Sequence, residues 1–146
     1  MGQAPVGDVM DSCKQLVAVI SSDFDDDSAS SFQAFIESLH NQQWHHGAPL
    51  FFDEVDEEGC YRPEDIPVRS VGCVLNFPAN DERDRSVEQA SYADVSSLIG
   101  LLERYSQDHV LEFEVELDGT YVGTIEDGKA NRTLAVGLME AWRTSI

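Results

Sequence analysis

The sequence predicts a single α+β domain, 1–146, in which helices pack on an antiparallel-rich sheet of about five strands. Short apolar runs of strand type alternate with stretches in which apolar residues recur with helical spacing. In chain order they give β-α-β-β-α-β-β-α, and the first six elements match a ferredoxin-like core. The chain is long enough to bury a substantial core. Residues 1–13 carry no strong pattern, so we expect a loose N-terminal arm or a short helix there.

The clearest element is a hairpin followed by a helix near the end of the chain. Apolar residues alternate with glutamates over 111–117, and Asp118-Gly119 suits a two-residue turn. The expected register places Val115 opposite Val122 and Phe113 opposite Thr124. The face opposite the core would then carry Glu112, Glu114, Glu116, Tyr121 and Ile125.

The remaining elements follow from apolar runs, capping residues and breakers. Strands are expected over 15–21, 50–55 and 68–77, separated by loops at 22–31, 56–67 and 80–85. One helix follows a possible capping box of Ser30 and Gln33, and a second follows an N-terminal pair of Ser91 and Asp94. Asn131 is a plausible N-cap for the last helix, whose apolar stripe is formed by Leu134, Leu138 and Trp142.

Charge restricts the classes of partner. The chain has 28 acidic and 9 basic residues, a formal net charge of −19. Such a field repels nucleic acid and anionic membranes, and it attracts a basic protein surface, a cation or a salt-rich solvent layer. Adaptation to a salty host explains the acidity as well as a basic partner does. No signal peptide or membrane-spanning run is apparent, so we expect a cytoplasmic protein.

Catalytic and metal motifs are weak. Asp23, Asp25 and Asp27 have the spacing of a calcium loop, but Ser28 and Ala34 replace its glycine and its final glutamate. A divalent-cation site, or a small metal-dependent enzyme built on this loop, is therefore the alternative function; acids at a helix start are the simpler explanation. His40, His45 and His46 lack metal-ligand spacing, and Cys13, Cys60 and Cys73 form no C-x-x-C motif. We predict no enzyme activity and no cofactor.

The candidate functional residues therefore lie on the surface. Like charges along one strand face repel mildly, so three glutamates beside a tyrosine suggest a site for a basic protein partner. An exposed sheet face with ordinary solubilising glutamates is the simpler interpretation. A second acidic cluster is Asp53–Glu58, and Asp81–Asp84 is a third. The predicted partner-binding residues are Glu112, Glu114, Glu116, Tyr121, Asp53, Glu54, Asp56, Glu57 and Glu58.

One resemblance points in the same direction. The segment Gly123-Thr-Ile-Glu-Asp-Gly128, followed by Leu134, Gly137-Leu138 and Trp142, resembles a C-terminal pattern of small bacterial immunity proteins from polymorphic-toxin loci. It covers about a fifth of the chain and consists of structural residues. The resemblance implies a compact acidic protein that neutralises a cognate toxin domain by binding it, and it supplies no site residues. The oligomeric state is left open.

Overall fold

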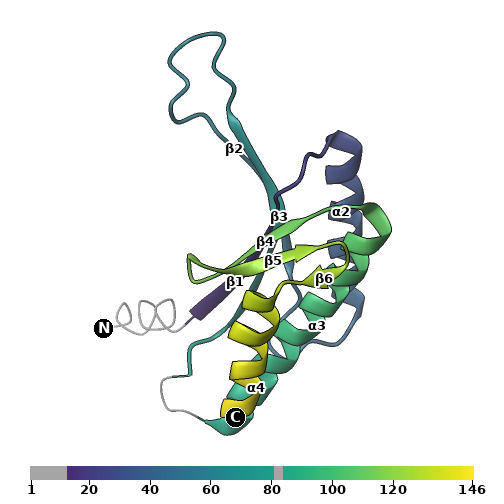
Figure 1. Ribbon diagram of the computed structural model, residues 1–146, viewed down its shortest axis with the longest axis vertical. Coiled ribbons are helices and arrows are strands. Elements are labelled where there is room, and N and C mark those ends of the chain that lie inside the picture. Colours follow the sequence, from purple (N-terminus) through teal and green to yellow (C-terminus); the bar gives the residue numbers. More distant parts are fainter. Residues whose placement is uncertain (1–12, 81–83) are drawn as a thin grey trace, which may run out of the picture.

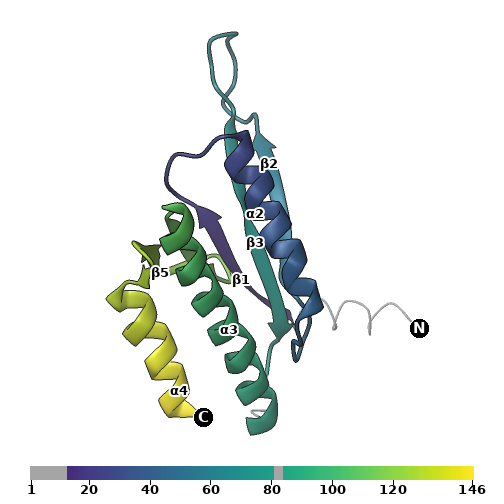
Figure 2. The same cartoon turned by 90° about the vertical axis from the view of Figure 1, so that its right-hand side faces the viewer.

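The computed structural model describes residues 13–80 and 84–146 as one antiparallel six-stranded sheet with helices on one face (Figures 1 and 2). This confirms the α+β class. The expectation for the N-terminal arm lies, up to residue 12, outside the described residues, as do residues 81–83 of the third acidic cluster. The elements are β1 (Cys13–Ile20), α2 (Asp26–Ser38), η1 (Leu39–Asn41), β2 (Leu50–Asp56), β3 (Val68–Pro78), α3 (Arg85–His109), β4 (Phe113–Leu117), β5 (Thr120–Glu126), β6 (Lys129–Ala130), η2 (Thr133–Glu140) and α4 (Ala141–Ser145).

The strand order is β2-β3-β1-β4-β5-β6. β3 lies between β1 and β2, and β1 lies between β3 and β4, so two β-α-β units interleave as a ferredoxin-like core requires. β5 and β6 then extend the sheet beyond β4. The expected strand number is one too low because β6, which follows the Asp127-Gly128 turn, is too short to show a period of two.

The core lies between the sheet and the helices. Leu16, Leu75 and Val115 project from the sheet and are fully buried. The Phe32 ring of α2 lies 5.4 Å from the Tyr105 ring and 5.3 Å from the Phe113 ring, centroid to centroid, which joins both long helices to β4. Each fully buried side chain of this size contributes roughly 1.5–3 kcal/mol to folding.

Both long helices begin earlier than the sequence pattern predicts. Asp25 caps α2 by accepting a hydrogen bond from the Ser28 backbone N–H at 2.8 Å, so the predicted capping box at Ser30 is wrong. Asp84 caps α3 in the same way through Ser86, at 2.9 Å. An aspartate carboxylate is among the strongest N-caps, and it lets an acidic segment join the helix.

The last hairpin has the predicted turn but a different register. Leu117 lies opposite Thr120, as expected, whereas a β-bulge shifts the rest so that Val115 lies opposite Gly123. The bulge turns Ile125 into the core, where it is fully buried, so its prediction as a surface residue is wrong. The bulge requires a glycine at position 123. The φ of Gly123 is +147°, and a Cβ there would lie 2.5 Å from Leu134 Cβ.

The C-terminal helical segment packs on the same face of the sheet as α3. The Asn131 side chain accepts a hydrogen bond from the Leu134 backbone N–H at 3.0 Å, which is the predicted capping contact. From Thr133 the chain makes π-helical turns before it becomes α-helical at Ala141. Trp142 then anchors the segment on α3 by donating from Nε1 to Glu88 at 2.7 Å.

Candidate partner-binding surface

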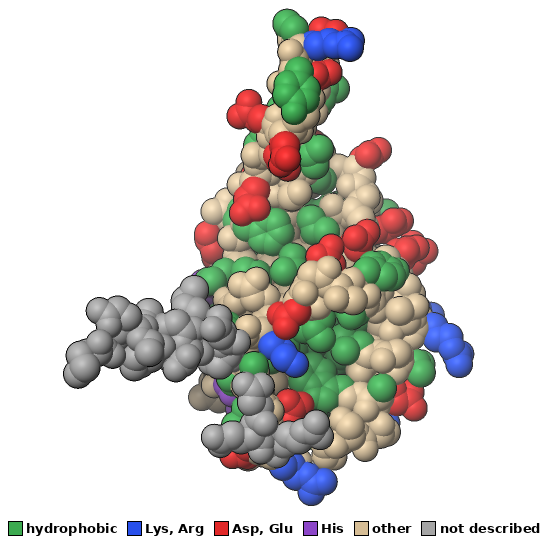
Figure 3. Space-filling view, turned by 90° about the vertical axis from the view of Figure 1, so that its left-hand side faces the viewer, with side chains coloured by type: hydrophobic (Ala, Val, Ile, Leu, Met, Phe, Trp, Pro, Cys, Tyr) green, Lys and Arg blue, Asp and Glu red, His purple; other side chains and the backbone are tan. Residues whose placement is uncertain are grey.

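The face of the sheet turned away from the helices is the main candidate surface, and we call it the open face. Figure 3 shows it from the side opposite to Figure 2, with apolar side chains gathered over the strands and acidic side chains around them. Within the described residues, every helix that packs on the sheet does so on the other face (Figure 2). The C-terminal helical segment therefore also leaves the open face uncovered.

Strand register arranges the open face in rows. One row crosses five strands through paired residues, and the next row runs parallel to it. In both rows the positions on β2, β3 and β1 are apolar or glycine, and the position on β4 is a glutamate. The rows are Leu50, Val74, Val17, Glu116, Tyr121 and Phe52, Gly72, Val19, Glu114, Thr124.

The apolar half of this face was not recognised as functional from the sequence. Val17 and Val19 lie half-buried on the open face, although they belong to a run that suits a central strand covered on both sides. Gly72 of β3 lies between Val19 of β1 and Phe52 of β2. A Cβ at Gly72 would lie 3.0 Å from Phe52 Cζ, so the missing side chain lets the phenyl ring lie on β3. Apolar residues occupy both the odd-numbered and the even-numbered positions of β1. This pattern in the sequence could have indicated an apolar open face.

The acidic half consists of the predicted glutamates. Glu114 and Glu116 are half-buried among the strands, Glu112 is exposed, and Tyr121 is 50% exposed beside Glu116. None of the three glutamates forms a salt bridge with a described residue. Among the strand positions that share the open face, the only cation is Lys129 on the short edge strand β6. These four predicted residues therefore do lie together.

Asp53 does not belong to this surface. Its carboxylate receives two hydrogen bonds from Arg69, at 3.0 and 2.7 Å, and Arg69 also contacts Asp26 of α2 at 2.6 Å. The hydrogen bonds and the charge of Arg69 hold the pKa of Asp53 below its usual value. The Arg69 guanidinium lies 5.5 Å from the centre of the Phe24 ring. Asp53 thus joins the sheet to the start of α2, and its carboxylate is already paired.

The other predicted acids lie at the base of a long loop between β2 and β3 or within it. This loop, residues 57–67, we call the arm. Figures 1 and 3 show it projecting well beyond the end of the sheet. Asp65 accepts hydrogen bonds from the backbone N–H groups of Tyr61 and Arg62, at 2.9 and 3.0 Å, which orders the tip. Tyr61 is 89% exposed and Ile66 is 86% exposed. Glu54 and Asp56 lie at the base of the arm, and Glu57 and Glu58 lie in it.

The alternative metal site receives no support. Asp25 is engaged as a helix cap, and the hydrogen bonds from Ser28 hold its pKa below the usual value. Asp26 binds Arg69. Over residues 13–80 and 84–146, no group of three or more His, Cys, Asp or Glu side chains is placed to hold a metal ion. The acids of this loop act locally, at the helix start.

The segment that contains His45 and His46 is connected to α3, where the sequence predicted a capping pair of Ser91 and Asp94. The sequence pattern did not reveal this connection. Asp94 lies buried inside α3 and accepts hydrogen bonds from the backbone N–H groups of His45 and His46, at 2.9 and 2.8 Å. Ser91 is also buried in the helix. The prediction that this pair caps the helix is therefore wrong, because the helix begins six residues before Ser91. Asp94 instead fixes the loop that leads to β2.

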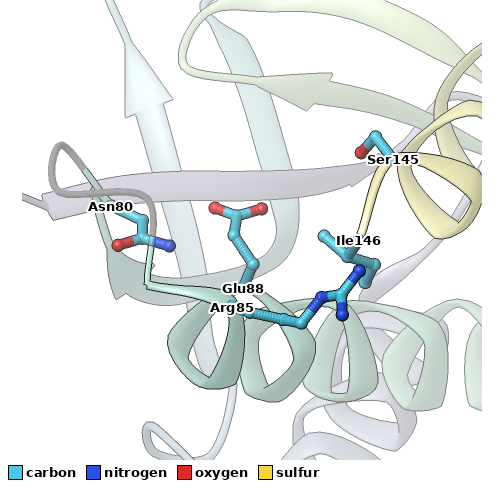
Figure 4. A pocket seen from close by; sticks show the side chains of 5 residues that line it. All are labelled: Asn80, Arg85, Glu88, Ser145 and Ile146. Carbon is cyan, nitrogen blue, oxygen red and sulfur yellow. The ribbon is translucent and has the colours of Figure 1, made fainter.

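Cys73 and the pocket beside α4 both belong to the packing of the fold. Cys73 is fully buried, and burial raises the pKa of its thiol to about 12. A shallow pocket of about 380 Å³ lies where the start of α3 meets the end of α4 (Figure 4). Glu88 at its wall is already bound to Trp142, so the pocket belongs to the junction of two helices.

Comparisons with known proteins give no assignment. No protein-family model matches the chain, no curated protein matches it, and no solved structure matches it. No helix among the described residues is long and apolar enough to cross a membrane.

Proposed function

We propose that the chain is a non-enzymatic binding domain that uses its open face to bind a basic protein, as an immunity-type inhibitor of a cognate bacterial toxin domain. The observation that supports this proposal most is the division of the open face into an apolar half and an acidic half. Val17, Val19 and Val74 supply apolar contact area, while Glu114 and Glu116 supply charge that forms no salt bridge with the described part of the chain. Protein interfaces combine these features, with apolar contacts for affinity and charge for specificity and association rate.

An affinity-capture experiment with matched charge variants tests the proposal. The variant Glu112→Gln, Glu114→Gln, Glu116→Gln removes three charges from the open face. The control Asp23→Asn, Asp108→Asn, Glu140→Gln removes three exposed charges elsewhere. We expect the wild type and the control to capture the same basic protein from native cells, with association that slows as salt is added, and the open-face variant to lose it.

The inhibitory part needs a second measurement. The captured protein, expressed alone in bacterial cells, should arrest growth, and co-expression of the wild-type chain should restore it. Equal capture by both triple variants would contradict the open-face proposal. Capture without any effect on growth would leave a binding domain and remove the toxin assignment.

A further inference from the structure

β2 forms one edge of the sheet. It pairs with β3 in an unbroken register, from Leu50 opposite Val74 to Asp56 opposite Val68, and no other described strand pairs with its second side. The N–H and C=O groups along that second side are therefore not used by the sheet. Such an edge is a template for another strand, and proteins usually block it with proline, charged side chains, a bulge or a short strand. β2 has seven residues without proline, lysine or a bulge, and its only protection of this kind is its carboxylates, whereas β6 at the opposite edge has only two residues.

The side chains of β2 are accessible as well as its backbone. Leu50 and Val55 are exposed large apolar residues, and Glu54 and Asp56 are exposed. Leu50 and Glu54 belong to the open face, so a strand added beside β2 would continue that face outward. Strand addition of this kind takes its affinity from backbone hydrogen bonds and its specificity from alternate side chains.

Charge decides which strand fits this edge. β2 carries three carboxylates and no cation, and only Asp53 has a salt bridge within the described residues. A second copy would bring Glu54 and Asp56 of both chains to one seam, where like charges opposite each other destabilise the pairing. A strand with lysine or arginine at alternate positions would pair with these carboxylates instead.

From this combination we propose that the β2 edge binds an extended basic segment of a partner protein as an additional strand of the sheet. The inference rests on the proposed function only for the basic character of the partner. On the side chains that share the open face, the added segment carries two apolar residues, which lie beside Leu50 and Phe52, together with two basic residues, which lie beside Glu54 and Asp56.

The probe is a capped nine-residue peptide whose alternate positions carry two lysines and then two valines, with threonine at the positions between them. We expect it to bind the full chain and to shift the backbone amide resonances of residues 50–56 more than those of 112–116. N-methylation of one alternate set of peptide amides should abolish binding, since it removes the donors that face β2, while methylation of the other set should preserve it. Glu54→Lys in the chain should weaken binding roughly tenfold, and Glu140→Lys should not.

The outcomes separate this proposal from the previous one. If both methylated peptides bind as tightly as the parent, the attraction is only electrostatic and the strand-addition proposal is overturned; a peptide that does not bind overturns it too. Neither result affects capture through Glu112, Glu114 and Glu116. Sedimentation that shows a dimer of the isolated chain, together with shifts of the amide resonances of residues 50–56 on dilution, would assign the edge to a second copy and overturn the choice of a basic partner.

Discussion

At the scale of single residues, backbone geometry at a few positions decides where side chains point. Gly123 lies at the bulge that places Thr124 on the open face and Ile125 in the core. Its φ of +147° is unfavourable for other residues, and Asn131 Oδ1 would lie 2.6 Å from an added Cβ. One glycine thus decides that Thr124, and not Ile125, contributes to the candidate binding surface.

Gly123→Ala should therefore destabilise the fold by about 2 kcal/mol or more, through steric overlap and backbone strain. Gly100 offers a matched control, because it lies inside α3 and a Cβ there meets nothing within 4 Å. Gly100→Ala should stabilise the fold by up to about 1 kcal/mol. Urea unfolding at neutral pH measures both changes, and equal effects of the two variants would contradict the structural role of Gly123.

At the scale of elements, the sequence gives the strands more accurately than the helix starts. The apolar runs locate β2 within one residue, since a buried or half-buried strand leaves a direct apolar pattern. The starts of the two long helices are predicted wrongly because 22–31 and 80–91 contain many Ser and Asp residues, each a competent cap. Packing of Phe32 and Tyr105 selects among them, and that contact joins residues far apart in the chain.

The candidate site divides in a similar way. Alternation along one strand was enough to group Glu112, Glu114 and Glu116, because period two is a local property. The pairing of Asp53 with Arg69 depends on the register between β2 and β3, which no local pattern gives. The apolar half of the open face depends on the helices packing on a single face, which is again a tertiary property.

The cap of α3 gives a pH-dependent prediction at this scale. Hydrogen bonds from Ser86 hold the pKa of Asp84 below the ordinary value of 3.8. A lowered pKa in the folded state means that the ionised cap stabilises the fold above pH 3.8 and loses this effect as the pH falls through the folded-state pKa. Asp84→Asn should keep the capping geometry but not this titration.

Urea unfolding of both proteins between pH 7 and pH 2.5 tests the prediction. The wild type should be the more stable protein at pH 7, and the difference should shrink below about pH 4. Titration of the other acids is common to both proteins and cancels in the comparison. A difference that stays constant over this range would show that the charge of the cap contributes nothing.

At the scale of the whole molecule, the net charge of −19 opposes compaction. Raising NaCl from 10 to 300 mM should stabilise the fold by about 1 kcal/mol, or about 4 °C in melting temperature, because screening shortens the range of repulsion. The gain should level off well below molar salt. MgCl₂ at equal ionic strength should match NaCl, given that the described residues contain no metal cluster. Melting curves in the two salts check both statements.

A stability that continues to rise in molar KCl would favour the salt-adapted explanation of the acidity. A larger gain in stability with MgCl₂ than with NaCl at equal ionic strength would instead favour a cation site among the acids around Asp25. The expected saturation would leave a basic partner as the better explanation of the acidic open face. This experiment needs only the isolated chain.

The position of β1 has a consequence for biosynthesis. β1 is made first among the described strands, yet it lies in the middle of the sheet, between β3 and β4. Its apolar run therefore stays unpaired on one side or both until the ribosome has synthesised the chain as far as Leu117. Contacts over such sequence separations form slowly, and an apolar strand left open meanwhile is exposed to aggregation. The nascent chain should accordingly depend on chaperone protection until late in its synthesis.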